Sequence, residues 1–146
     1  LVFLTDIHSL GLKNTEGLLH TTSWYWDMND ASRAFANKFF AKTKRMPTDV
    51  QAADYSAVMQ YLKAVQAVKT TDADKVMAYL KSTPLSDFYA KGTIRPDGTY
   101  AHDMYLVEVK KPSESKKPWD YLKVLSTLPG GQVFTTKAET KCALWK

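Results

Sequence analysis

The sequence is poor in the features that mark metal sites, membrane spans and familiar enzymes. Of its 146 residues only Cys142 is a cysteine, whereas thiolate metal sites need several Cys or His ligands at defined spacing. No run of 18 apolar residues occurs, the length that predicts a membrane-spanning helix. A G-x-G-x-x-G phosphate loop and a G-x-S-x-G nucleophile motif are also missing. We therefore predict no metal, no cofactor and no catalytic residues.

The charge of the chain is mild and scattered. Its net charge is +5, from 20 basic and 15 acidic residues. The lysines form only short clusters, at 42–45, 110–111 and 116–117. A nucleic-acid-binding domain needs a basic stripe or a recognisable module, so we predict no nucleic-acid partner. The hydrophobic fraction of 45% and the charged fraction of 24% are those of an ordinary folded domain.

The pattern of apolar and turn-forming residues predicts an α/β fold with about three helices and a late β-hairpin. The hairpin turn is predicted by Pro96, Asp97 and Gly98. At the other end of the chain, residues 1–16 are consistent with a turn of helix or a loop. The predicted elements are a strand over 17–26, helices over 30–43, 49–69 and 73–82, a hairpin over 93–109 and a strand over 119–128. The predicted N-caps of the three helices are, in order, Asn29 or Asp30, Thr48 or Asp49, and Asp72.

Side-chain positions within these elements can also be predicted. The helix over 49–69 has an apolar stripe that includes Tyr61, which is therefore expected in the core. The predicted strand over 100–109 has His102 and Asp103 on its solvated face. The start of the helix over 49–69 leaves backbone N–H groups unpaired, and such groups can receive an anion.

Two short stretches carry candidate functional residues. Asp6 and His8 are two residues apart in the predicted loop, and an Asp–His pair can orient an imidazole for base catalysis. The pair has no recognisable nucleophile, so ordinary hydrogen bonds or ligand contact is the favoured interpretation. Trp24, Tyr25 and Trp26 are adjacent, and strand side chains alternate faces, so we expect at least one of these rings outside the core.

The order of several segments resembles a known family. The segments are GLLHTT, YWDMND, MPTDVQAADYSAVMQYLKAV and GTIRPDGTYAHDMYLVEVK. Their order resembles that in the C-terminal part of the periplasmic solute-binding proteins of ABC importers. The resemblance is to their type I branch, which binds Leu, Ile and Val and includes receptors for aromatic acids. It implies two Rossmann-like lobes joined by three crossing segments. Residues 1–146 would then be a C-terminal fragment of the ligand-binding domain, with no separate second domain.

The resemblance also implies a function without catalysis. The protein would capture a small carboxylate in the periplasm, either a hydrophobic amino acid or an aromatic acid, and deliver it to a membrane permease. The chain opens on Leu1-Val2-Phe3-Leu4, with no Met and no signal peptide, which suggests a longer parent sequence. The upstream part of that protein would be needed to complete both lobes.

Few site residues carry over from the family. In the family a side chain at the start of the helix with the Tyr-x-Ala motif lines the pocket, and the matching positions are Val50 and Gln51. Asp6 and His8 would fall in a loop near the cleft. Tyr25 and Trp26 would fall where the chain passes to the next lobe, so that changing either should alter ligand binding or lobe closure more than folding.

Two other functions stay open from the sequence. The first is a ligand-sensing domain of the same fold in a regulatory or receptor protein, which a fused effector domain would reveal. The second is an unrelated α/β enzyme, which would lose turnover when Asp6 or His8 is changed.

Overall fold

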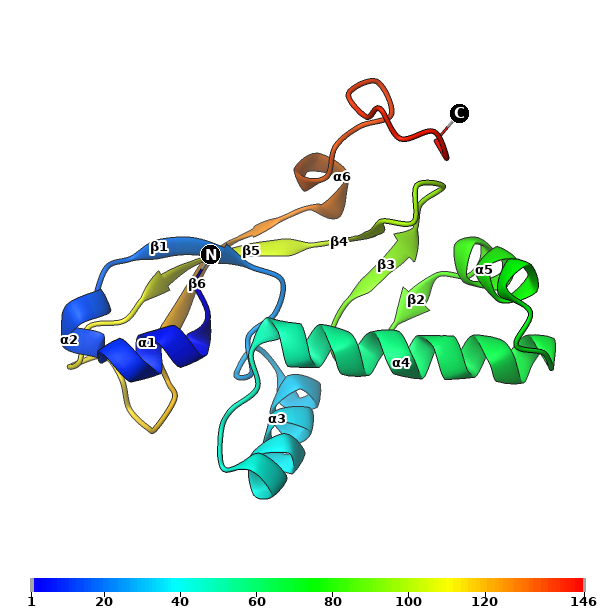
Figure 1. Ribbon diagram of the computed structural model, residues 1–146. Coiled ribbons are helices and arrows are strands. Elements are labelled where there is room, and N and C mark those ends of the chain that lie inside the picture. The colour runs from blue at the N-terminus through cyan, green and yellow to red at the C-terminus, as the bar shows by residue number, and fades with distance from the viewer. Residues whose placement is uncertain (1, 146) are drawn as a thin grey trace. The chain divides into compact units, whose positions relative to one another are not determined.

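The computed structural model describes residues 2–145 and shows a mixed α/β fold within them (Figure 1). The described residues form six helices and two three-stranded sheets. In chain order the elements are α1 (Leu4–Leu10), α2 (Leu12–Thr15), β1 (Leu19–Thr22), α3 (Asp30–Thr43), α4 (Asp49–Val68), α5 (Ala73–Ser82), β2 (Leu85–Ser86), β3 (Lys91–Ile94), β4 (Tyr100–His102), β5 (Met104–Val109), β6 (Leu122–Leu128) and α6 (Gly130–Val133).

The chain forms two compact units, each built from two separate segments. Unit 1 holds Leu1–Ala53 and Met104–Leu128, and unit 2 holds Asp54–Asp103 and Pro129–Lys146. The chain therefore passes between the units three times: within α4, between β4 and β5, and between β6 and α6. Three connections of this kind are what the family resemblance implied.

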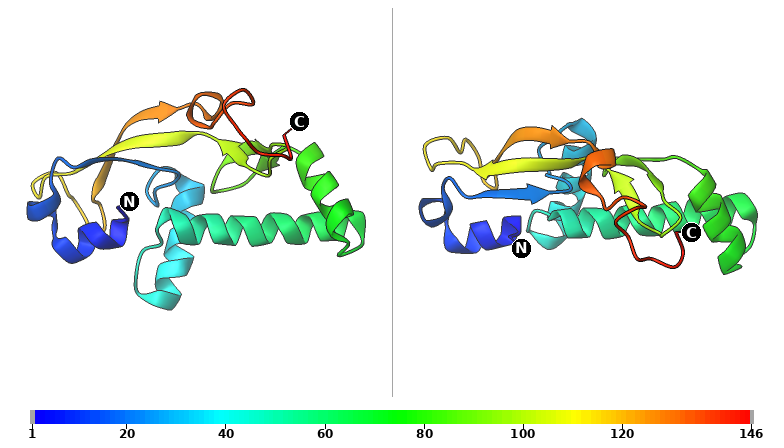
Figure 2. Two further views of the ribbon diagram at one scale, coloured as in Figure 1. Left: turned by 45° about the horizontal axis from the view of Figure 1, so that its top comes forward. Right: turned by 90° about the horizontal axis from the view of Figure 1, so that it is seen from above.

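Unit 1 is organised around an antiparallel sheet with strand order β1-β5-β6. Helices α1 and α2 run along one side of this sheet (Figure 2). The buried side chains of Ile7, Val107, Val109 and Leu122 form much of its core. A register shift between Leu106 and Val107 interrupts the pairing of β5 with β6, as a β-bulge does in a twisted sheet.

Unit 2 is organised around a second antiparallel sheet, with strand order β2-β3-β4. Its core consists of Ala64 from α4, Val76 and Leu80 from α5, and Leu85 from β2. Partly buried apolar side chains from α4, α5, β3 and β4 pack against this cluster. Burial of this apolar surface stabilises the unit.

The three long helices are confirmed, and so are two of their predicted caps. The Asn29 side chain accepts a hydrogen bond from the Ser32 backbone N–H at 2.9 Å, at the start of α3. The Asp72 side chain accepts one from the Lys75 backbone N–H at 3.0 Å, at the start of α5. Caps of this type satisfy backbone donors that the helix itself leaves unpaired.

The predicted continuous strand over 100–109 is wrong. The chain breaks at Asp103, so that β4 pairs with β3 in unit 2 while β5 pairs with β1 and β6 in unit 1. The prediction of a solvated His102 is also wrong, because the side chain is buried. The rings of Tyr89, Tyr100 and Phe134 surround it, with ring centroids at 5.0–5.7 Å.

The predicted apolar stripe of α4 is wrong at Tyr61, although Val65 and Val68 of the same helix pack against the core of unit 2. In unit 2 this helix buries Ser56, Gln60 and Ala64, whereas Tyr61 is 44% exposed. The buried polar pair is satisfied by one carboxylate: Ser56 Oγ donates to Asp87 Oδ2 at 2.6 Å, and Gln60 Nε2 donates to the same oxygen at 3.0 Å. Buried polar side chains are tolerated when they are hydrogen-bonded in this way, so polar residues rather than tyrosine face inward.

Two further features concern membranes and metals. Among residues 2–145, no helix combines the length and the apolar character needed to cross a membrane. Within the same described range, no group of three or more His, Cys, Asp or Glu side chains is arranged to hold a metal ion.

Candidate functional site

A small pocket in unit 1 lies at the start of α4. Its enclosed volume is about 10 Å³, which is room for a single water molecule. A larger ligand would therefore rest against its rim rather than inside it. The pocket is lined by Val2, Phe3, Leu4, His20, Thr22, Trp24, Tyr25, Pro47, Thr48, Asp49 and Leu122, and we call it the His20–Asp49 pocket.

The start of α4 is held by a reciprocal cap. The Gln51 side-chain oxygen accepts hydrogen bonds from the Thr48 backbone N–H at 2.8 Å and from Thr48 Oγ1 at 2.6 Å. Thr48 Oγ1 in turn accepts from the Val50 backbone N–H at 3.3 Å. This is the arrangement of a capping box, and it fixes the first turn of α4 beside the pocket.

Asp49 places a carboxylate at this helix start. Its Oδ2 accepts a hydrogen bond from Ser23 Oγ at 3.3 Å, and its Oδ1 accepts one from the Val50 backbone N–H at 3.1 Å. A negative side chain is favoured there because the helix N-terminus carries partial positive charge. Since Asp49 already supplies that negative charge, the position suits a cationic ligand group better than the anion considered from the sequence.

His20, in β1, faces the same pocket from the sheet. Its Nδ1 is buried and has no hydrogen-bond partner among the described residues. Burial lowers the pKa of His20 by disfavouring the imidazolium, and the negative charge of Asp49 opposes that shift. The folded protein therefore favours a neutral imidazole at the rim of the pocket.

The lowered pKa of His20 predicts how stability depends on pH. The folded state binds fewer protons at this site than the unfolded chain, so the free energy of unfolding should fall as pH drops below about 6.5 and level off above it. His20→Gln should flatten this fall, as measured by urea unfolding between about pH 5 and pH 8. A variant with the same pH dependence as the parent protein would show that another group is responsible.

Val50 and Gln51 follow Asp49 in the first turn of α4 but are not among the residues that line the pocket, and their environments differ. Val50 is 43% exposed in the first turn of α4. The oxygen of Gln51 is engaged in the cap with Thr48. Val50 is therefore the freer of the two side chains for ligand contact.

Asp6 and His8 do not form the pair considered from the sequence. They lie in α1, not in a loop, because Leu4 and Ile7 bury one face of a helical turn that ends at Gly11. Helix residues two apart point to different sides. The Asp6 carboxylate accepts a hydrogen bond from the Phe3 backbone N–H at 2.8 Å, whereas His8 Nδ1 contacts the Tyr121 hydroxyl at 2.7 Å.

The expectation that one of Trp24, Tyr25 and Trp26 lies outside the core is wrong. Their exposed fractions are 2%, 5% and 4%. The strand ends at Thr22, so face alternation no longer applies to the three rings. Trp24 Nε1 donates to Ser32 Oγ at 3.0 Å, which turns this ring toward α3.

Tyr25 and Trp26 meet at one backbone carbonyl. The Tyr25 hydroxyl and Trp26 Nε1 both donate to the carbonyl oxygen of Trp119, at 3.0 Å and 2.9 Å. The Tyr25 hydroxyl also accepts from the backbone N–H groups of Tyr121 and Leu122. Burial raises the pKa of Tyr25 well above its usual range. Tyr25 lines the His20–Asp49 pocket, while Trp26 does not.

Sequence reasoning missed His20 and Thr22, which line this pocket, and Ser23, which donates to Asp49. His20 stands between Leu19 and Thr21 in a strand, and a lone histidine there could have been noticed. Ser23 offered no signal, because its contact with Asp49 spans 26 residues. Asp49 was considered only as a helix cap.

Comparisons with known proteins identify relatives. A family described as "Periplasmic binding protein" matches residues 1–117. The chain is similar to the crystal structure of a periplasmic binding protein from Burkholderia mallei, with 64% identity and a TM-score of 0.98. It is also similar to a branched chain amino acid ABC transporter periplasmic ligand-binding protein from Burkholderia xenovorans LB400, with 46% identity and a TM-score of 0.96. Both matches cover 100% of this chain and 39% of the solved chain.

A more distant structure shows the same fold. The amino acid ABC transporter substrate-binding protein of Pseudomonas fluorescens Pf-5 is 24% identical, with a TM-score of 0.83 over 96% of this chain and 37% of its own. No curated protein matches the chain.

Proposed function

We propose a ligand-binding function from one premise: this chain belongs to the periplasmic binding protein family. Its fold is part of the type I periplasmic binding protein fold. The family consists of binding proteins rather than enzymes. The chain spans 39% of the length of the solved relatives that it matches at 64% and 46% identity, so the function proposed below is that of the whole protein.

The proposed function is that of the solute-binding component of an ABC importer in the periplasm. The protein captures a small carboxylate, either a hydrophobic amino acid or an aromatic acid, and delivers it to a membrane permease. The observation that carries this proposal is the 46% identity, over the whole chain, to a protein described as a branched chain amino acid ABC transporter ligand-binding protein. The three passages of the chain between two compact units support it.

The His20–Asp49 pocket gives the proposal a chemical basis. The Asp49 carboxylate suits a ligand ammonium group, and the neutral imidazole of His20 adds a hydrogen-bonding group in the same pocket. The ring of Tyr25, which lines the pocket, and the exposed Val50, which follows Asp49 in α4, supply apolar surface. Polar groups next to apolar surface are typical of small-molecule sites.

A thermal-shift screen of the complete gene product against amino acids and aromatic acids tests the proposal. A ligand that binds only the folded protein raises its melting temperature. For an amino-acid ligand, Asp49→Asn should weaken binding by about tenfold or more, because a charge-assisted hydrogen bond is lost. The matched control is Asp54→Asn, which changes an exposed aspartate five residues further along the same helix and should bind like the parent protein.

The two variants separate the outcomes of this screen. Equal losses in Asp49→Asn and Asp54→Asn would contradict the role of Asp49. If an aromatic acid binds the parent protein and Asp49→Asn equally well, the ligand has no ammonium group at this position. A folded protein that responds to no carboxylate would contradict the proposed function.

A further inference from the structure

Unit 1 contains a second hollow, which shares no residue with the His20–Asp49 pocket. Its volume is about 260 Å³, close to the lower end of small-molecule sites. It opens between α1, the connection from α3 to α4, and the connection from β5 to β6. It is lined by Thr5, His8, Ser9, Lys44, Arg45 and Trp119, and we call it the His8–Arg45 hollow. Three lining residues are basic types and none is acidic.

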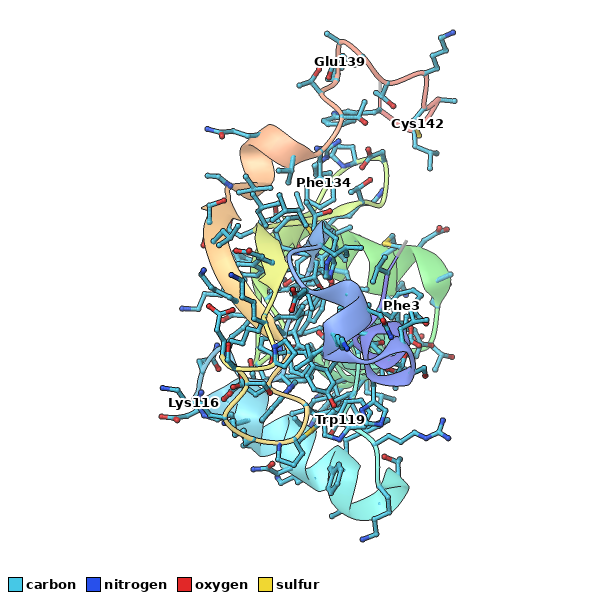
Figure 3. All side chains as sticks on the ribbon, turned by 90° about the vertical axis from the view of Figure 1, so that its left-hand side faces the viewer. Phe3, Lys116, Trp119, Phe134, Glu139 and Cys142 are labelled. Carbon is cyan, nitrogen blue, oxygen red and sulfur yellow. The ribbon has the colours of Figure 1, made fainter. Side chains whose placement is uncertain are left out.

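The aromatic wall of this hollow is firmly held. The His8 ring stacks on the Trp119 indole, with centroids 3.9 Å apart and planes at 11°. His8 Nδ1 is fixed by the Tyr121 hydroxyl at 2.7 Å, so the other ring nitrogen is left for a ligand. Trp119 is only 7% exposed, and it lies in the connection between β5 and β6 (Figure 3).

The basic residues stand on an ordered turn. Lys44 adopts the left-handed conformation that ends α3, with φ of 60°, and its backbone N–H donates to the Phe40 carbonyl at 2.8 Å. Thr43 Oγ1 donates to the carbonyls of Phe39 and Arg45 and accepts from the Arg45 backbone N–H. Lys44 Nζ donates one hydrogen bond to the Ala41 carbonyl at 3.1 Å, which leaves two of its N–H groups, and Lys44 and Arg45 both line the hollow.

Arg45 differs from the other two arginines in its partners. Arg33 forms ion pairs with Asp27 and Asp30, and Arg95 forms one with Asp97. Arg45 forms no ion pair with any described carboxylate. A guanidinium offers five N–H donors in a planar fork that matches a carboxylate or a phosphate.

We propose that the His8–Arg45 hollow binds a small oxyanion, a carboxylate or phosphate group, through Arg45 and Lys44. The hydroxyl of Thr5 and the free nitrogen of His8 complete the set of hydrogen-bonding groups, and the Trp119 face closes one side. The site goes beyond the solute-binding function, because its residues are separate from those of the His20–Asp49 pocket.

Titration calorimetry of the complete gene product at low ionic strength tests this site, with inorganic phosphate and succinate as probes. The parent protein should bind at least one probe, and the double variant Lys44→Gln/Arg45→Gln should bind it at least about tenfold more weakly. The matched control is Lys42→Gln, which removes an exposed charge from the same helix but does not line the hollow. It should bind like the parent.

Two further readouts keep the result decisive. The indole N–H signal of Trp119 in NMR spectra should shift on titration in the parent protein and stay still in the double variant. A short peptide rich in Asp and Glu tests whether the oxyanion is a side chain of another protein. If the peptide binds more tightly than succinate, the ligand is an acidic segment of a protein. If it binds more weakly, the ligand is a free anion. Absence of binding by all three probes, or equal losses in the double variant and Lys42→Gln, would overturn the proposal.

Discussion

Gly130→Ala is expected to lower the free energy of unfolding by about 1–3 kcal/mol, the range for overpacking a well-packed site. A Cβ atom at Gly130 would lie 2.7 Å from the backbone carbon and oxygen of His102. Those atoms belong to the backbone, so no side-chain rotation can relieve the contact. The Gly130 N–H also donates to Asp103 Oδ1 at 3.0 Å, and a displaced backbone would weaken that bond as well.

The neighbouring glycine provides the control. A Cβ atom at Gly131 would meet nothing within 4 Å, and both glycines lie in α6. Gly131→Ala should therefore be neutral or stabilising by up to about 1 kcal/mol, since alanine is the better helix former. Urea unfolding of the two variants measures the difference. Equal free energies of unfolding for the two variants would mean that the backbone at Gly130 can move away from the His102 backbone without loss of stability.

Tyr25→Phe is expected to destabilise the protein by about 1–3 kcal/mol, the cost of leaving buried polar groups unsatisfied. Its hydroxyl donates to the Trp119 carbonyl at 3.0 Å and accepts from the backbone N–H groups of Tyr121 and Leu122 at 3.2 Å and 3.4 Å. The side chain is 5% exposed, so water cannot replace the lost oxygen. The change removes one atom and leaves the ring's packing in place.

This expectation reverses the order of effects predicted from the sequence, where Tyr25 was to affect ligand binding more than folding. Tyr61→Phe is the matched control, because Tyr61 is 44% exposed and its replacement should change stability by no more than about 0.5 kcal/mol. Chemical denaturation compares the two. A Tyr25→Phe protein as stable as the Tyr61→Phe protein would show that the hydroxyl adds nothing to the fold.

Local signals predicted the helices well. Caps such as Asn29 and Asp72 act within three or four residues of the chain, so their effect is visible in the sequence. The predicted extents of α3, α4 and α5 agree with the structure to within one residue.

Long-range contacts explain what could not be predicted. The inward face of α4 depends on Asp87, which lies 31 residues after Ser56 and 27 after Gln60. The environment of Tyr25 depends on Trp119, 94 residues later. No local pattern encodes such partners, and therefore the polar stripe of α4 and the burial of the three aromatic rings appeared only in the structure. The Ser23–Asp49 contact at the candidate site has the same character.

Equilibrium binding of a hydrophobic amino acid or an aromatic acid to the complete gene product tests the proposed function most directly. Isothermal titration calorimetry should give a saturable 1:1 isotherm with at least one such carboxylate. For an amino-acid ligand, the isotherm should weaken in Asp49→Asn and persist in Asp54→Asn. A folded, monodisperse protein that binds none of these carboxylates would contradict the solute-binding account.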